Sequence, residues 1–251
     1  MTVPQLLILT GIFFIASTIS VIAGSTSLIT VPVMFGLGID PRTAIATNMM
    51  ALTLMSLGGT LPFIGQGVID RKRLPFLIIL TLAGSIVGAL LVFVLPSKSL
   101  PMLISLAMLM MAGFSIFQQN FRISPLEAIP AKILEIGGYL ATFILGIYGG
   151  FFSGGYVTLL TAAYVMLFRM TLIQAIATTK LINIFSSLIA TLIFVSQGIV
   201  DYSLGMLLGT AMFIGGMIGA KVALKLSNVW LQRIYLIVLF VLSYLTFQHR
   251  N

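Results

Sequence analysis

The sequence contains no cysteine, and its one histidine, His249, lies two residues from the end. Without cysteine the chain can form neither a disulfide framework nor a thiolate metal site. A single terminal histidine argues against a catalytic or metal centre built on imidazole. We therefore expect no metal and no cofactor, and any function must rest on other polar residues.

Charged residues are scarce as well. Only 7% of the residues are charged and 59% are hydrophobic, whereas water-soluble domains carry about 25% charged residues. This composition predicts an integral membrane protein in contact with a lipid bilayer. The net charge of +8 comes from basic residues scattered at the ends of apolar segments. That scatter fits membrane orientation better than nucleic-acid binding, which needs a basic stripe.

Apolar segments of helical length recur along the whole chain and are joined by short polar links. They predict an all-α integral membrane fold. The expected helices cover about residues 4–23, 26–38, 42–65, 73–96, 99–118, 131–151, 156–168, 172–196, 202–225 and 229–247.

The second half of the chain matches the first after a shift of 131 residues, without a gap. Residues 66–70 (QGVID) fall on residues 197–201 (QGIVD), and residues 44–47 fall on residues 175–178. Two copies of a helical unit are typical of secondary transporters, in which the substrate site lies between the copies. We assign residues 1–118 to the first membrane repeat, 119–130 to a cytoplasmic link and 131–251 to the second membrane repeat.

Each repeat is predicted to begin with a broken helical hairpin and to continue with three spanning helices. One helix over 4–38 would be roughly 50 Å long, whereas the hydrocarbon core is about 30 Å thick. Arg71, Lys72 and Arg73 follow the 42–65 helix, while the matching loop at 197–202 has no basic residue. The positive-inside rule therefore orients the repeats oppositely. Parallel repeats with eight full spans remain the alternative.

Both hairpins break at clusters of glycine and hydroxyl residues. A break inside a membrane leaves backbone N–H groups without helical partners, and the start of the following helix attracts negative charge. The breaks therefore predict an anion-binding site. Close helix packing by small residues is the alternative reading. The candidate residues at the two breaks are Gly24, Ser25, Thr26, Ser153, Gly154 and Gly155.

Lys180 is the most informative single residue, because it lies about two turns inside an otherwise apolar helix. Charges inside a membrane are costly and usually functional. Its match in the first repeat is Met49, so the repeat itself does not require the charge. The alternative is that Lys180 snorkels back to the membrane surface. Further candidates at similar depth are Thr47, Asn48, Thr178, Thr179 and Asn183.

Several motifs resemble the TauE/SafE (sulfite exporter) family of bacterial membrane permeases, over nearly the whole chain. The motifs are the break followed by Val31-Pro32, Gly38-Ile39-Asp40-Pro41, Ala44-x-Ala46-Thr47-Asn48, Gly67-x-x-Asp70 and Ala177-Thr178-Thr179-Lys180-Leu181-x-Asn183. The resemblance implies a multi-pass carrier for small anions in the bacterial cytoplasmic (inner) membrane. Sulfite, organosulfonates and short carboxylates are the substrates that it suggests, with outward transport coupled to protons.

The sequence therefore predicts a secondary transporter whose small anionic substrate binds between the two repeats at the helix breaks. An anion channel or a non-transporting membrane scaffold is the alternative. An enzyme would need paired carboxylates, a histidine cluster or an activated nucleophile within the membrane, and the sequence offers none. Whether the chain forms a homo-oligomer is left open.

Overall fold

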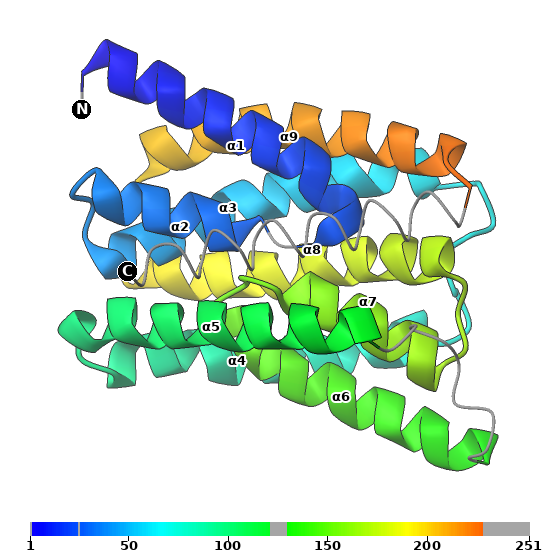
Figure 1. Cartoon of the computed structure of the whole chain (residues 1–251). Helices are drawn as coiled ribbons and strands as arrows, with labels where there is room; N and C mark the ends of the chain where they lie inside the picture. The colour runs from blue at the N-terminus through cyan, green and yellow to red at the C-terminus, as the bar shows by residue number, and fades with distance from the viewer. Residues whose placement is uncertain (1, 25, 121–129, 228–251) are drawn as a thin grey trace.

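The computed structural model describes residues 2–24, 26–120 and 130–227. These residues form α-helices and two short 3-10 helices, and no strand occurs among them. Figure 1 shows the helices lying side by side along one long direction. Their bounds are α1 Val3–Ala23, α2 Ser27–Gly36, α3 Pro41–Thr60, α4 Leu74–Val94, α5 Leu100–Asn120, α6 Ala131–Phe151, α7 Tyr156–Leu167, α8 Leu172–Ser196 and α9 Tyr202–Lys225, with η1 Leu61–Phe63 and η2 Ser97–Ser99.

The predicted all-α fold is confirmed, and the predicted helix ranges agree closely with α1 to α9. The predicted helix at 229–247 and most of the predicted link at 119–130 lie outside the described residues. Within the described part, α1, α3, α4, α6, α8 and α9 are long and apolar enough to cross a membrane. The first legs of both hairpins, α1 and α6, thus have the length of a full span, while α2 and α7 are short because the breaks interrupt them.

The outer surface of the bundle is apolar. Large exposed hydrophobic residues line the outer faces of α1, α4 and α6, among them Ile8, Ile79 and Leu140. The interior instead holds many buried hydroxyl and amide side chains along with its apolar core. This inverted distribution suits lipid outside and hydrogen-bonded polar groups inside, where each group needs a partner.

Matching helices of the two halves run in opposite directions. In Figure 1, α3 runs from left to right, whereas α8, its match after the shift of 131, runs from right to left. The same holds for α4 and α9. Hydrogen bonds between the halves are reciprocal: the Thr178 Oγ1 accepts from the Asp70 N–H at 3.3 Å, and the Thr47 Oγ1 accepts from the Asp201 N–H at 3.1 Å. Such reciprocity is the mark of a two-fold axis. It supports inverted repeats, although the side of the membrane that each loop faces stays a prediction.

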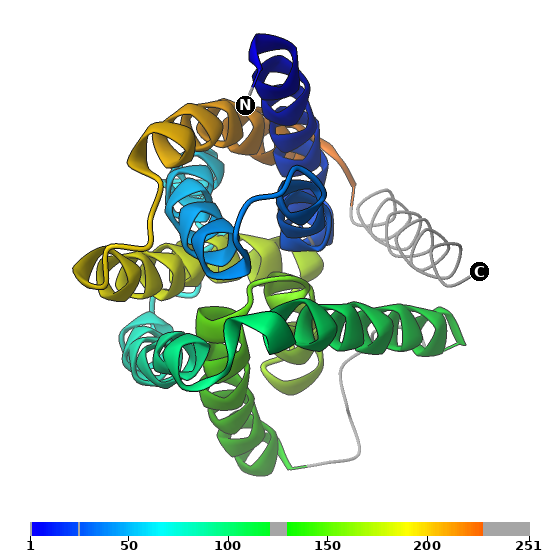
Figure 2. The ribbon, with the colours of Figure 1, turned by 90° about the vertical axis from the view of Figure 1, so that its left-hand side faces the viewer.

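Each hairpin packs against the other half of the molecule through glycines. The end-on view in Figure 2 shows α1 beside α9, and α4 beside α6. A Cβ atom added at Gly84 on α4 would lie 2.5 Å from the Phe143 carbonyl oxygen on α6. One added at the matching Gly215 on α9 would lie 2.6 Å from the Phe14 carbonyl oxygen on α1. Backbones approach this closely only where side chains are absent, so these glycines fix how each hairpin is held.

Candidate functional site

The first break is a tight turn between α1 and α2. Gly24 has a left-handed backbone with φ of 76°, and its N–H donates to the Ser20 carbonyl at 2.7 Å. A Cβ atom at Gly24 would lie 2.6 Å from the backbone nitrogen of Thr158, in the first turn of α7. Glycine is therefore needed both for the conformation and for the contact. The predicted Ser25 lies outside the described residues.

The second break has a different local structure. α6 ends at Phe151, and α7 begins after Gly155, which has φ of 82°. The Gly154 carbonyl accepts a hydrogen bond from the Tyr148 hydroxyl. A Cβ atom at Gly155 would lie 2.5 Å from the sulfur of Met111 on α5, so α5 covers this turn. Because Gly24 contacts Thr158 just beyond Gly155, the two breaks meet inside the protein.

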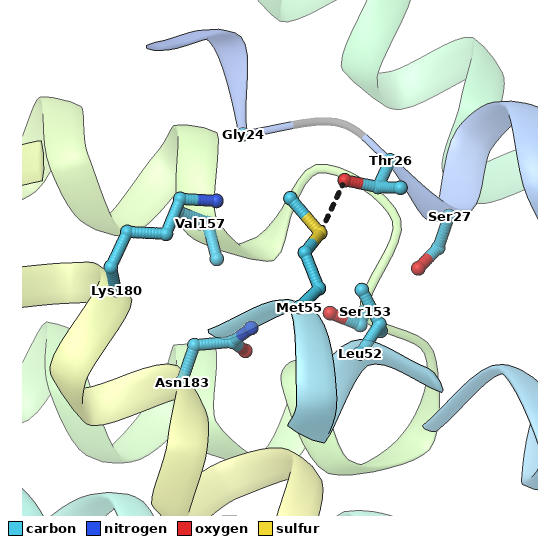
Figure 3. Close-up of a pocket in the computed structure, with 9 residues that line it drawn as sticks. All are labelled: Gly24, Thr26, Ser27, Leu52, Met55, Ser153, Val157, Lys180 and Asn183. Atoms are coloured by element: carbon cyan, nitrogen blue, oxygen red, sulfur yellow. Dashed lines mark hydrogen bonds between the residues drawn. The ribbon is translucent and has the colours of Figure 1, made fainter. Parts of the chain in front are cut away.

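A small pocket lies where the breaks meet. Figure 3 shows Lys180 and Asn183 extending from α8 into this space, with Ser153 from the second break. The lining residues are Gly24, Thr26, Ser27, Leu52, Met55, Ser153, Val157, Lys180 and Asn183.

The pocket is lined by matching positions of the two halves. Thr26 and Val157 match each other after the shift of 131, as do Leu52 and Asn183, and both members of each pair line the pocket. The shared position carries a polar residue in one half and an apolar residue in the other. The two halves therefore contribute matching positions but different side-chain polarity to the pocket.

Lys180 is buried, with 2% of its surface exposed. Its Nζ donates a hydrogen bond to the Ser20 carbonyl oxygen, the same oxygen that accepts from the Gly24 N–H, at a distance of 3.2 Å. The side chain thus points to the end of α1 and does not snorkel to the surface. Among the described residues, the salt bridges involve Arg73 and not Lys180. The buried ammonium meets the carbonyl end of a helix, where the helix dipole favours positive charge.

Asn183 and Asn48 occupy different layers around the pocket. Asn183 lines it, and its Nδ2 donates to the Ser56 Oγ at 2.7 Å. The Asn48 Nδ2 donates to the Ser27 Oγ at 2.9 Å, and its Oδ1 accepts from the Thr30 hydroxyl at 2.7 Å. Asn48 therefore positions Ser27 from behind the pocket wall.

The remaining predicted residues lie outside the pocket lining. The hydroxyls of Thr179 and Thr161 are 3.1 Å apart, and this pair matches Asn48 and Thr30 in the first half. Thr47 and Thr178 hold the loops of the opposite repeat, as described above. The structure thus gathers Gly24, Thr26, Ser153, Lys180 and Asn183 around one space and gives Thr47 and Thr178 a structural role.

The pocket also has lining residues that the sequence reasoning missed, namely Ser27, Leu52, Met55 and Val157. Two of them had a usable signal, because Leu52 and Val157 are the repeat matches of the predicted Asn183 and Thr26. Met55 gave no signal, since a methionine in an apolar helix is indistinguishable from ordinary core packing.

The acidic residues within the described part lie away from this lining. The Asp201 carboxylate accepts from the Leu204 N–H at 3.0 Å and caps the start of α9. Asp70 instead accepts from the Lys72 N–H at 3.2 Å, in the turn before α4, whose N-cap residue is Arg73. The Arg73 guanidinium bonds Asp70 at 2.7 Å and Glu135 at 3.1 Å. Partial burial lowers the pKa of Arg73, but these two carboxylates outweigh it and raise that pKa. No group of three acidic or histidine residues suited to a metal ion occurs among the described residues.

Comparison with known proteins decides the family. The model of the family described as "Sulfite exporter TauE/SafE" matches residues 9–245. The chain belongs to this family. TauE/SafE proteins are membrane transporters, and the spans found here agree with a multi-pass protein of a bacterial membrane.

Relatives within the TauE/SafE family carry transporter names. A Sinorhizobium sp protein named "Probable membrane transporter protein ORF9" is 29% identical over 218 residues, which cover 84% of this chain and 80% of that protein. A "Probable membrane transporter protein" of Haemophilus influenzae is 27% identical over 96% of this chain and 94% of its own length. "Probable membrane transporter protein YfcA" of Escherichia coli K12 is 26% identical over 94% and 88%. The protein is accordingly a membrane transporter.

Proposed function

We propose that the protein is a secondary transporter that exports a small anion such as sulfite, an organosulfonate or a short carboxylate, and that the pocket between the breaks is its binding site. The observation that carries this proposal is Lys180, a buried ammonium in a pocket whose lining contains no carboxylate. A buried positive charge needs a negative partner, and an incoming anion is the partner that the pocket can accept.

The other polar lining residues suit the oxygen atoms of such an anion. Asn183, Ser153 and Thr26 provide amide and hydroxyl donors. The first turn of α7, at Tyr156, places further backbone N–H groups near the second break. Helix starts and charged donors together form strong sites for carboxylate and sulfonate oxygens.

The apolar part of the lining bears on the size and shape of the substrate. Leu52, Met55 and Val157 supply the hydrophobic wall surface of the pocket, which lies among these donors. A wall of this kind favours an anion that carries a short carbon chain, because the apolar part of such a ligand gains contact area. Within the proposed class, organosulfonates and short carboxylates should therefore bind better than sulfite.

Outward transport and proton coupling form the remaining part of the proposal. The exporter name of the family supports outward transport. Proton coupling is suggested only by the resemblance to that family, and no contact within the described residues bears on it. Proton coupling can be tested with a proton gradient imposed across proteoliposomes. The gradient should drive accumulation of a transported anion, and collapse of the gradient should stop the accumulation.

The deciding experiment is an uptake assay with purified protein in proteoliposomes. Radiolabelled sulfite, methanesulfonate and acetate should be taken up saturably and should compete with one another, whereas choline and divalent cations should have no effect. Robust cation transport without a response to any anion would overturn the assignment. A voltage-clamped bilayer separates a carrier from a channel, because only a channel would give unitary conductance steps.

A further inference from the structure

Beyond the pocket, buried hydroxyl groups line the seam between α4, α7 and α8. The hydroxyls of Ser85 on α4 and Ser186 on α8 are 2.7 Å apart, and the Ser85 hydroxyl also donates to the Gly146 carbonyl at 3.2 Å. Ser186 lies one helical turn beyond the pocket residue Asn183, so the hydroxyl seam begins next to the pocket.

Two further hydroxyls in this seam lack a hydrogen-bond partner among the described residues. They belong to Thr81 on α4 and Tyr156 at the start of α7, and both side chains are fully buried. The Tyr156 hydroxyl nevertheless interacts with the hydroxyls of Thr81 and Ser186, although not in regular hydrogen-bond geometry. Buried hydroxyls with poor hydrogen bonds are expensive in a membrane interior, so their retention here calls for a function.

The polar surface continues along α4 toward one end of the molecule. Ser85, Thr81, Leu77 and Arg73 follow one another at intervals of four residues and so share one face of the helix. Leu77 is the one apolar member of this row. The row ends at Arg73, whose guanidinium also lies 5.1 Å from the Phe168 ring after α7.

The second hairpin, formed by α6 and α7, also places polar groups along the seam. On α7, eight residues after Tyr156, the Tyr164 hydroxyl lies 3.2 Å from the Thr142 hydroxyl of α6. Polar groups thus extend from the pocket toward the Arg73 end on both sides of the seam.

The four matching positions in the other half carry no hydroxyl. Residues 73, 77, 81 and 85 of α4 correspond to Leu204, Leu208, Met212 and Gly216 of α9. A Cβ atom at Gly216 would lie 2.7 Å from the Met55 carbonyl oxygen on α3, so backbones meet there without intervening side chains. The row on α4 therefore carries hydroxyls where the matching row on α9 carries none, although the hydroxyls of Ser17 and Thr18 on α1 lie against α9 beside Gly215.

We propose that the seam between α4, α7 and α8 is the passage through which a small anion moves between the pocket and the Arg73 end of the protein. The seam is closed in this structure, since Thr81, Ser85 and Tyr156 are fully buried. It opens when α8 moves away from α4, which breaks the contact between Ser85 and Ser186. The seam hydroxyls then replace the water around the anion, and the Arg73 guanidinium draws it to or from the surface. The nature of the passing ion rests on the proposed function, whereas the opening of the seam does not.

Cysteine labelling tests the passage, because the chain has no cysteine of its own. Thr81→Cys is compared with the matched Met212→Cys in proteoliposomes, using the anionic thiol reagent 2-sulfonatoethyl methanethiosulfonate. Cys at position 81 should react roughly tenfold faster than Cys at position 212, because only the polar seam opens to water. Modification at position 81 should also block methanesulfonate uptake. If Thr81→Cys does not fold, the labelling rate of Ser186→Cys is compared with that of Met212→Cys instead.

The outcomes separate this inference from the proposed function. Equal labelling at positions 81 and 212 overturns the passage, and so does full labelling at position 81 with unchanged uptake. Rapid labelling at position 81 in a protein that takes up no anion would instead refute the proposed function while leaving an opening seam in place.

Discussion

The Lys180 ammonium donates a hydrogen bond to the carbonyl oxygen of Ser20, which lies 160 residues earlier in the chain. This contact joins the second repeat to the end of α1, where the first hairpin breaks. An anion that binds Lys180 can accept from the other two N–H groups of the ammonium while the Ser20 carbonyl accepts from the first. Substrate binding is thereby linked to the position of the α1 end, and the predictions below begin with this pair.

Replacement of Lys180 by Met, the residue at its repeat match Met49, should strongly weaken anion binding. The affinity should fall by about tenfold or more, because a hydrogen bond to a charged group is worth about 1.5–3 kcal/mol. Thermal stability should stay nearly unchanged, since a buried charge is exchanged for an apolar side chain of similar length. Lys180→Arg should retain part of the binding. Methanesulfonate uptake and thermal shift measure both quantities, and unchanged uptake by the Met variant would remove Lys180 from the site.

Substitution of Gly24 by Ala should destabilise the protein by about 1–3 kcal/mol, the usual cost of a strained backbone conformation. The Ala side chain would meet the Thr158 backbone nitrogen as well as require an unfavourable φ. Gly11→Ala is the matched control, because Gly11 lies within α1 and has nothing within 4 Å of an added Cβ atom. Thermal unfolding in detergent should show a lower melting temperature for Gly24→Ala and an unchanged melting temperature for Gly11→Ala. Equal melting temperatures would contradict the tight turn described here.

The two reciprocal threonines should contribute equally to stability. Thr47→Val and Thr178→Val each remove one hydrogen bond to the loop of the opposite repeat. Each variant should lose about 1 kcal/mol, the typical net value of such a bond. Thr210→Val serves as the control, since the exposed Thr210 hydroxyl bonds only Met206 of its own helix. A loss in one threonine variant without the other would show that the halves do not support each other symmetrically.

The inverted arrangement can be tested with the topology of two matching loops. Lys72→Cys should be labelled by an impermeant maleimide from the cytoplasmic side, and Ser203→Cys from the outside. The reason is that Arg71, Lys72 and Arg73 hold the first loop inside, whereas the second loop has no basic residue. The experiment uses whole cells and inverted vesicles. Labelling of both positions from one side would establish parallel repeats.

The sequence by itself determined the membrane environment and the helical fold, and it predicted the duplication. These properties follow from composition and from a regular shift, and both are visible without knowing any contact. It also singled out Lys180 and the break at Gly24, because a charge in an apolar helix and a glycine cluster between helices each carry a local cost.

The tertiary structure alone decided which polar residues share a space. Thr178 lies about 7.5 Å before Asn183 on α8, yet only Asn183 lines the pocket, while Thr178 and its match Thr47 bond loops more than 100 residues away. The packing of the helices makes this difference, and glycine contacts such as that of Gly84 with α6 help to set that packing. Distant backbone contacts of this kind leave no periodic trace in one sequence. For the same reason the sequence alone does not predict the polar seam that contains Thr81 and Tyr156, because the seam depends on how α4, α7 and α8 pack.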